Sequence, residues 1–308
     1  MTVPPAFDCL IIGGGPAGLM AALYLARFGR RFLLVDGGAS RAAWIPTSHN
    51  LPFFAEGIAG SDLLQRQRDS LLTHGVAPLR GLVTGLRRQE GGFRAVVRPQ
   101  QGADHVVAAR HVLLATGARD IEPALPRLAE AVQRGLLRYC PICDGYEARG
   151  QRIAVVGIGA HGLEEAVFLA RTYSSRVTLM TLGTALEDAG RARLAEHGIA
   201  LVEQPVTDLA MQDGAIEALT TDGDRHRFDT AYAALGLHVR SELARALGAE
   251  RDAGGALVVD AHNCTTVPGF YAAGDVARGL NQIVVAMGHA AQAATAIHNR
   301  CSRLAEEA

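Results

Sequence analysis

The sequence predicts an α/β protein built from two Rossmann-like domains. Two glycine-rich turns, Gly13–Gly18 and Gly157–Gly162, each follow a short apolar strand and precede a helical pattern. A strand, a glycine turn and a helix in that order are typical of a dinucleotide-binding βαβ unit. With 308 residues, the chain is long enough for two domains that each bury a core of their own.

The first βαβ unit is predicted at the start of the chain. Phe7–Ile12 is a short apolar strand, Leu19–Arg27 carries a helical pattern of apolar residues, and Phe32–Val35 is a second strand. These three elements flank the first glycine turn. A glycine motif alone is weak evidence for dinucleotide binding, and the strand, helix and strand around it strengthen that prediction.

The turn itself carries the glycines that pyrophosphate binding requires. Gly13 permits the tight bend, Gly15 lets the backbone approach a pyrophosphate, and Gly18 lets the helix pack on the strand. The helix N-terminus then presents free N–H groups to the phosphates. Asp36 ends the second strand, where its carboxylate can accept a hydrogen bond from a ribose hydroxyl. We therefore predict a dinucleotide site at this turn.

The middle of the chain predicts one more helix and then a group of strands. Ser61 is expected to cap a helix that runs toward His74. The core-facing side of that helix is predicted to consist of four leucines, Leu63, Leu64, Leu71 and Leu72. Residues 80–115 predict β-strands separated by glycine-containing turns.

A second βαβ unit begins at Arg152. Its first strand is Ile153–Val156, its helix is Leu163–Tyr173 and its second strand is Val177–Met180. Further short strands are predicted over residues 199–235, and a long alanine-rich helix closes the chain.

Between the two turns lies a C-x-x-C motif, Cys140-Pro141-Ile142-Cys143-Asp144. Such a motif can be half of a zinc site, a structural disulfide or a redox pair. Zinc needs about four ligands, and no second C-x-x-C or H-x-x-x-H follows, so we predict no metal. Beside dinucleotide-binding units, a dithiol is suited to exchanging two electrons with a flavin. Cys9 is expected to pack in the core as part of the first strand, and Cys264 and Cys301 are expected to be bystanders.

The composition favours a globular protein and excludes two classes of partner. Apolar residues make up 49% and charged residues 20% of the chain, and the net charge is −1. That balance predicts neither nucleic-acid binding nor binding to an anionic membrane. No apolar run approaches the ~18 residues that span a bilayer. The opening residues Met1–Pro5 lack the pattern of a secretory signal, so we expect a cytoplasmic protein.

Taken together, these elements resemble the low-molecular-weight thioredoxin reductases, a family of two-domain flavoproteins. The resemblance covers nearly the whole chain. It rests on the first glycine turn, Asn50-Leu51-Pro52, Ala115-Thr116-Gly117, the C-x-x-C-Asp motif, and Ala272-Ala273-Gly274-Asp275 followed by Asn281-Gln282. It implies a homodimer whose FAD-binding domain, a three-layer ββα fold, is discontinuous and comprises residues 1–116 and 244–308. An NAD(P)H-like domain, residues 117–243, would carry the cysteines.

The resemblance also assigns residues to the FAD site. Gly274 and Asp275 would lie under the ribityl and pyrophosphate groups, and Gln282 and Ile283 would touch the isoalloxazine ring. The matching motif residues Asn50, Ala115, Thr116 and Gly117 are assigned to the same site, together with Gly13, Gly15, Gly18 and Asp36 of the first unit.

For the redox pair, the resemblance implies that Cys143 lies against the flavin and that Cys140 exchanges with substrate. Asp144 matches the acid that shuttles a proton. The chemistry agrees, because a dithiol must lose two protons to become a disulfide and a nearby carboxylate can take or return one. The alternative for Asp144 is an acid that only stabilises the N-terminus of a helix.

The chain departs from the family at the second nucleotide site. The family's second strand there ends in His-Arg-Arg, whose arginines hold the NADPH 2′-phosphate, whereas this chain reads Val177–Gly183 with neither an arginine nor an acid. Without a cation, the site cannot form charge-assisted hydrogen bonds to the 2′-phosphate, each of which contributes ~1.5–3 kcal/mol to binding. We therefore expect weak use of NADPH or NADH. Arg191 and Arg193 follow, but their spacing gives no reason to expect them at the site.

Two histidines lie near the predicted sites. His161 stands in the second glycine turn and His289 on the terminal helix. A lone histidine has no partner visible in the sequence, so we interpret His289 as a packed or surface residue and leave the role of His161 open.

The sequence is compatible with three functions. The first is an FAD-dependent thiol–disulfide oxidoreductase acting on a thioredoxin-like protein or a small disulfide or dithiol. The second is a dithiol oxidase of the gliotoxin and holomycin type that uses oxygen. Gly145-Tyr146-Glu147 favours it, but those oxidases commonly carry His in place of Asp144. The third is a non-enzymatic flavin redox sensor, which would need no proton shuttle.

Overall fold

The chain divides into two compact units. The computed structural model describes residues 7–306; unit 1 takes 7–43, 60–119 and 238–306 of these, and unit 2 takes 44–59 and 120–237. The predicted boundaries at 116 and 244 fall a few residues from these divisions. The segment 44–59, however, groups with unit 2. Met1–Pro5, on which the expectation of no secretory signal rests, lies outside the described residues.

Unit 1 is built from strands and helices that come from both ends of the chain. They are β1 (Phe7–Ile12), α1 (Pro16–Arg27), β2 (Phe32–Asp36), the 3₁₀ helix η1 (Arg41–Trp44), α2 (Gly60–Leu72), β3 (Leu79–Gln89), β4 (Gly92–Pro99), β5 (His105–Leu114), β6 (Ala118–Asp120), β15 (Leu237–Val239), α7 (Glu242–Ala246), β16 (Phe270–Ala272) and α8 (Ile283–Glu306). Of these, η1, β6 and β15 lie where the chain passes between the units.

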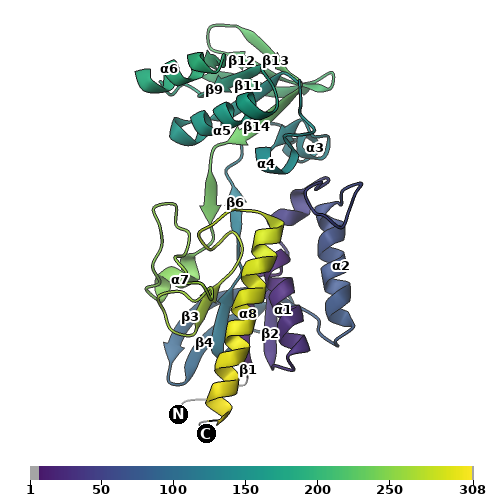
Figure 1. The fold of residues 1–308 in the computed structure, drawn as a ribbon, viewed down its shortest axis with the longest axis vertical. Helices are drawn as coiled ribbons and strands as arrows, with labels where there is room; N and C mark the ends of the chain where they lie inside the picture. The colour runs from purple at the N-terminus through teal and green to yellow at the C-terminus, as the bar shows by residue number, and fades with distance from the viewer. Residues whose placement is uncertain (1–6, 307–308) are drawn as a thin grey trace. The chain divides into compact units, whose positions relative to one another are not determined.

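Three layers make up unit 1. Five strands pair in parallel in the order β3-β2-β1-β5-β16. The remaining parts of β3 and β5 pair with β4 in an antiparallel sheet. Apolar side chains fill the space between the two sheets, including Leu10, Phe93, Val112 and Phe270. Helices α1 and α8 pack side by side over the parallel sheet (Figure 1). The predicted three-layer ββα fold is confirmed.

The sequence located most elements of unit 1, with three corrections. Helix α1 begins at Pro16 instead of Leu19, because proline is well suited to a first helical position. Ser61 lies inside α2, which begins at Gly60, so it is not the N-cap. Leu72 is 56% exposed, unlike the other three leucines. At 3.6 residues per turn, Leu72 lies on the opposite side of the helix from Leu63.

Unit 2 holds the second Rossmann-like fold. Its elements are α3 (Leu128–Gln133), β7 (Leu137–Arg138), α4 (Pro141–Asp144), β8 (Ile153–Gly157), α5 (Gly159–Thr172), β9 (Val177–Met180), α6 (Asp188–Glu196), β10 (Ala200–Val202), β11 (Val206–Gln212), β12 (Ala215–Thr220), β13 (Arg225–Phe228) and β14 (Thr230–Ala234). Five strands run parallel in the order β10-β9-β8-β14-β7, and β11, β12 and β13 form an antiparallel sheet.

The second βαβ unit is confirmed, with its helix longer than predicted. Strand β9 has the predicted bounds, and β8 extends by one residue to Gly157. Helix α5 begins at Gly159, inside the glycine turn, which places its N-terminus directly at the end of β8. None of the described helices is long and apolar enough to cross a membrane.

Two helical glycines of unit 1 have opposite surroundings. A Cβ at Gly18 would lie 1.8 Å from the carbonyl oxygen of Gly13, whereas one at Gly288 would meet no described atom within 4 Å. We expect Gly18→Ala to lower the free energy of unfolding by about 1–3 kcal/mol, because its neighbours must shift. Gly288→Ala should raise it by about 0.5–1 kcal/mol. Thermal denaturation compares the two variants, and equal melting temperatures would contradict this packing.

Candidate functional site

The first glycine turn lies at the carboxyl end of β1, against the backbone at the end of β5. Gly13 has a φ of 117°, and a Cβ there would lie 2.2 Å from the carbonyl oxygen of Ala115. Gly15 precedes α1 and offers the first turn of that helix no side-chain cap. The N–H groups at this helix end are therefore available to an anion.

Gly14 is a further required glycine that the sequence argument missed. A Cβ at Gly14 would lie 2.1 Å from the carboxyl carbon of Asp36. The Asp36 side chain is buried, and its oxygens accept hydrogen bonds from the Gly38 N–H at 2.8 Å and from Arg80 Nη1 at 2.7 Å. Arg80 is brought there by the pairing of β2 with β3, in which it is the direct partner of Asp36. The run of three glycines was the signal available for Gly14.

The Gly274-Asp275 motif lies next to the first glycine turn. A Cβ at Gly274 would lie 3.1 Å from Cβ of Ala17, in the first turn of α1, and 3.5 Å from Cβ of Ala286, in the first turn of α8. Asp275 forms an ion pair with Arg41 at 3.2 Å. Gln282 and Ile283 lie at the start of α8, where the Gln282 carbonyl oxygen accepts a hydrogen bond from the Ala286 N–H.

The segment Ala115–Gly117, which follows β5, forms hydrogen bonds with the backbone of Arg240. Ala115 follows β5 under the glycine turn, and its Cβ is 3.5 Å from the position of a Cβ at Gly18. Thr116 Oγ1 donates a hydrogen bond to the carbonyl oxygen of Arg240 at 2.6 Å. The carbonyl oxygen of Gly117 in turn accepts a hydrogen bond from the Arg240 N–H.

The sequence-predicted FAD residues therefore divide between the two units. Eleven of them lie in unit 1, namely Gly13, Gly15, Gly18, Asp36, Ala115, Thr116, Gly117, Gly274, Asp275, Gln282 and Ile283. Asn50 is exposed and belongs to unit 2, where its Oδ1 accepts a hydrogen bond from Ser48 Oγ at 3.0 Å.

The residues of unit 1 fit an adenine dinucleotide. The glycine turn leaves backbone N–H groups open to a pyrophosphate. An ionised carboxylate offers about four lone-pair positions, so Asp36 keeps room for a ribose hydroxyl beside the Gly38 and Arg80 bonds.

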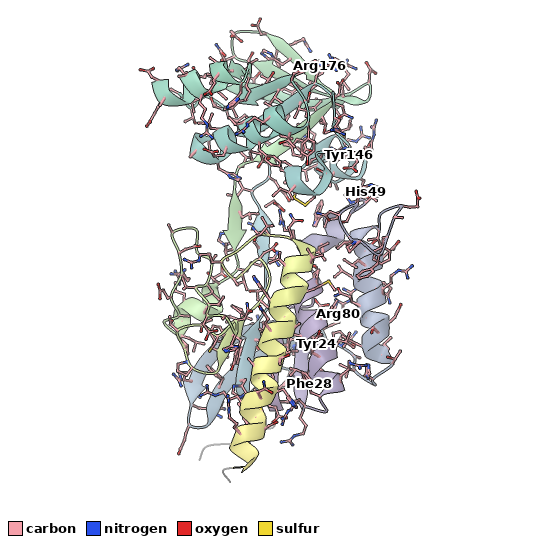
Figure 2. All side chains as sticks on the ribbon, viewed as in Figure 1. Tyr24, Phe28, His49, Arg80, Tyr146 and Arg176 are labelled. Carbon is pink, nitrogen blue, oxygen red and sulfur yellow. A yellow bond between two sulfur atoms is a disulfide. The ribbon has the colours of Figure 1, made fainter. Side chains whose placement is uncertain are left out.

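The C-x-x-C motif forms a disulfide in unit 2. Cys140 and Cys143 are bonded, with their Cα atoms 5.3 Å apart (Figure 2). Cys140 directly precedes α4, and its carbonyl oxygen accepts a hydrogen bond from the Cys143 N–H at 2.9 Å. Strand β7 leads into this segment, so the disulfide and the second glycine turn both follow carboxyl ends of the same parallel sheet.

Asp144 directly follows the disulfide in sequence and lies in a partly buried, polar setting. Its Oδ1 accepts a hydrogen bond from Tyr232 Oη at 2.9 Å, and its Oδ2 is 3.0 Å from Arg138 Nη1. Burial raises the pKa of Asp144, while the Arg138 charge and the two side-chain hydrogen bonds oppose that rise. These contacts differ from those of an acid that only caps a helix, since the carboxylate faces side chains of β7 and β14.

The second glycine turn has the close packing and the open position that a Rossmann-like turn requires. A Cβ at Gly162 would lie 2.6 Å from the carbonyl carbon of Gly157, whereas one at Gly159 would meet no described atom within 4 Å. The space that a phosphate needs is therefore present. The two arginines that follow are already paired, Arg191 with Glu203 and Arg193 with Glu164.

Strand β9 ends in a tight turn. Leu182 and Gly183, which follow the strand, have φ values of 54° and 92°. Thr181 is buried, and its Oγ1 donates a hydrogen bond to the carbonyl oxygen of Thr184 at 2.5 Å. The turn thus closes on itself instead of presenting a charged side chain.

Two side chains of the redox site, and one buried acid on α5, were missed from the sequence. Arg138 and Tyr232 lie in β7 and β14, and nothing in their local pattern distinguishes them from ordinary strand residues. Glu165 did give a signal, because it falls on the buried side of α5 between Gly162 and Leu169, where an acid is unusual. Its side chain is only 10% exposed.

The two histidines have different surroundings. His161 is exposed, and its Nε2 lies 3.8 Å from Glu165 Oε2. His289 is half-buried and packs against Gly279, with its Cε1 3.3 Å from the position of a Cβ there. Burial lowers the pKa of His289, and its Nδ1 meets no hydrogen-bond partner among residues 7–306.

Comparisons with known proteins agree with this arrangement. A family model described as pyridine nucleotide-disulphide oxidoreductase matches residues 7–290. The thioredoxin reductase of Mycolicibacterium smegmatis is 32% identical over 281 residues, which are 87% of this chain and 88% of that protein. Other curated relatives are longer, and the chain spans 57% to 64% of their length.

Two solved structures match over nearly the whole chain. The thioredoxin reductase from Streptococcus pyogenes MGAS5005 superposes with a TM-score of 0.85 at 26% identity, covering 96% of this chain and 98% of that one. HlmI superposes with a TM-score of 0.84 at 30% identity, covering 99% of this chain and 98% of its own.

Removing the Tyr232 hydroxyl tests its bond to Asp144. At about pH 8, Tyr232→Phe should lower the free energy of unfolding by about 1.5–3 kcal/mol, because it deletes a hydrogen bond to a partly buried carboxylate. That bond favours the ionised form, so its loss raises the pKa of Asp144 further. The destabilisation is therefore largest above the pKa of Asp144 and shrinks as the pH falls through it.

Urea denaturation over a pH series measures this difference, with the exposed Tyr146→Phe as the control. A loss of stability that stays constant with pH would contradict the link between the hydroxyl and the Asp144 charge.

Proposed function

The chain belongs to the pyridine nucleotide-disulphide oxidoreductase family, and we propose that it passes electrons between FAD and the Cys140–Cys143 disulfide and on to a second disulfide or dithiol. It is an oxidoreductase of the thioredoxin reductase type. The observation that carries the proposal is the disulfide itself, which the partly buried Asp144 follows directly in sequence at the sheet edge that also holds the second glycine turn. FAD, when bound in unit 1, supplies the two-electron chemistry.

Each residue of the redox site has a proposed role. Reduction of the disulfide takes up two electrons and two protons, and Asp144 holds one of those protons next to the sulfur atoms. Arg138 and Tyr232 fix the carboxylate and limit how far burial raises its pKa. We assign Cys143 to the exchange with flavin and Cys140 to the exchange with substrate.

We further propose a thioredoxin-like protein or a small disulfide or dithiol as the substrate of a cytoplasmic homodimer. The thioredoxin reductase relative supports this substrate class. Ile142, between the two cysteines, is 49% exposed, and Tyr146, just beyond them, is 66% exposed. Exposed apolar side chains of this kind suit contact with a partner surface.

A dithiol oxidase that uses oxygen is the second candidate. It is favoured by Gly145-Tyr146-Glu147 after the motif and by the likeness to HlmI at 30% identity over 99% of the chain. The two functions differ in direction of electron flow, so oxygen consumption with a dithiol substrate separates them. A flavin redox sensor is less well supported, because a sensor has no need of the paired and buried Asp144. Repeated turnover instead of stoichiometric reduction excludes it.

The two cysteines should give different spectra when replaced. Cys140→Ser leaves a Cys143 thiol, which on ionisation should give a long-wavelength charge-transfer band with the bound flavin. Cys143→Ser should lack that band, although both variants lose turnover. Absorbance spectra of the purified holoproteins over a pH series test the assignment, and identical spectra would reverse or remove it.

We also expect slow flavin reduction by NADPH and by NADH. Neither a free cation nor a ribose-binding acid ends β9, and Arg191 and Arg193 are committed to Glu203 and Glu164. Without a cation for the 2′-phosphate or an acid for the ribose, the binding of NADPH or NADH should be weaker by several kcal/mol, which moves the dissociation constant toward the millimolar range. Anaerobic titration followed by flavin absorbance measures this. A Michaelis constant for NADPH in the low micromolar range would contradict it, and Leu182→Arg should improve NADPH more than NADH.

A further inference from the structure

Unit 2 contains a pocket of about 430 Å³ at the amino ends of β8, β9 and β10, beside β13. The disulfide segment and the second glycine turn follow the carboxyl ends of β7 and β8, so the pocket opens at the opposite edge of the same parallel sheet. The length of β8, about 15 Å, separates the two edges. The volume of the pocket falls in the range of small-molecule sites, about 300–1,000 Å³.

The pocket begins where the apolar core between the two sheets of unit 2 ends. Met180 of β9, Val202 of β10 and Phe228 of β13 belong to one buried cluster. Side chains two residues apart in a strand share a face. Two residues closer to the pocket, the same faces of these three strands carry Thr178, Ala200 and His226. These side chains are smaller or more polar than the core residues beside them, and they leave the space open.

Thr178 and His226 provide one hydroxyl group and one aromatic ring as walls of the pocket. Both side chains are half-buried. The His226 ring stacks on the Phe228 ring, with the centroids 6.5 Å apart and the planes 13° from parallel. Because Phe228 is fixed in the core, the stacked pair gives an organic group a flat surface on which to pack.

Four arginines line this pocket, whereas no carboxylate of residues 7–306 does. They are Arg152, Arg176, Arg225 and Arg227. Arg152 pairs with Asp229 and Arg227 with Glu217, both at 2.6 Å. Arg176 and Arg225 form no ion pair with the described residues, and Asp229, which interacts with Arg176, already accepts hydrogen bonds from Arg152 on both oxygens. The lining therefore carries more positive charge than its neighbouring acids balance.

Arg176 is held in place before any ligand binds (Figure 2). Its Nη2 donates a hydrogen bond to the carbonyl oxygen of Gly150. A guanidinium group has five N–H donors, so most of them remain for a ligand. The exposed Ser175 precedes it and also lines the pocket. Guanidinium groups bind phosphate oxygens through paired N–H groups, which makes phosphate a well-matched ligand here.

We propose that this pocket binds a small phosphate monoester, with its phosphate group at Arg176 and its organic part on the His226 ring. The surplus of arginines favours a doubly charged phosphate over a single carboxylate. The pocket is larger than a phosphate group, and the stacked rings account for the remaining space. This inference goes beyond the proposed function and does not depend on cycling of the disulfide.

The first test measures binding to the full-length holoprotein with FAD bound. Isothermal titration calorimetry with phenyl phosphate at pH 8, in a buffer free of phosphate, should show saturable binding. Inorganic phosphate should bind more weakly, because it lacks the ring. Phenol has the ring without the charge and should give no measurable binding. Absence of saturable binding by phenyl phosphate would refute the proposal, and equal binding of phenol would refute the role of the arginines.

The second test uses matched variants at exposed positions to locate the ligand. Ser175→Glu adds a negative charge to the pocket, whereas Ser175→Gln adds a side chain of similar shape without charge. We expect phenyl phosphate to bind the first at least about tenfold more weakly than the second, because like charges repel. Arg176→Gln should weaken binding about 10- to 100-fold, since charge-assisted hydrogen bonds are lost. Arg171→Gln, at an exposed position of α5 outside the pocket, should leave affinity unchanged.

A third variant tests the aromatic wall. His226→Ala should weaken the binding of phenyl phosphate more than that of inorganic phosphate, because it removes the ring and keeps the arginines. An equal loss for both ligands would contradict the placement of the organic part. Binding that persists unchanged in both Ser175→Glu and Arg176→Gln would place the phosphate at another site, such as the second glycine turn, and would overturn the proposal. None of these outcomes bears on the redox function, which is measured by turnover.

Discussion

Both units depend on the same geometric constraint, the close approach of a helix N-terminus to the end of a parallel strand. In unit 1, no Cβ fits between Gly18 and the carbonyl oxygen of Gly13. In unit 2, Gly157 and Gly162 meet in the same way, with the Gly157 carbonyl carbon 2.6 Å from the position of a Cβ at Gly162. Each helix can therefore begin at the sheet edge and direct its free N–H groups to the space beyond it.

The same sheet edge explains why residues distant in sequence serve one site. Strands β1, β5 and β16 run parallel, so the turns that follow them lie together, and Gly274 packs on Ala17 although the two are far apart in the chain. In unit 2, β7 and β8 end at a common edge, which brings the disulfide and Asp144 near the start of α5. The parallel topology thus assembles each site without long connecting loops.

Local patterns predicted the backbone of this protein better than its side-chain contacts. Strand β1 and the glycine turns could be located because an apolar run or a glycine determines the backbone conformation of only a few neighbouring residues. The predictions that Ser61 caps a helix and that Leu72 is a core residue were wrong. The first depends on the residue at which α2 begins, and the second on which side of α2 faces the core. Arg138 and Tyr232 could not be found, since they meet Asp144 only through strand pairing across the sheet. The placement of Asn50 likewise depends on how the segment 44–59 packs.

The turn after β9 limits which side chains can follow that strand. Gly183 adopts a φ of 92°, and a Cβ there would lie 3.0 Å from Pro205. A single codon change to arginine would place a side chain in a backbone conformation that only glycine adopts readily. An arginine at this position would require a different loop, by insertion, deletion or replacement of Pro205. Point substitution alone is therefore a poor route to an arginine pair at the end of β9, and an engineered NADPH site here would have to start from the loop backbone.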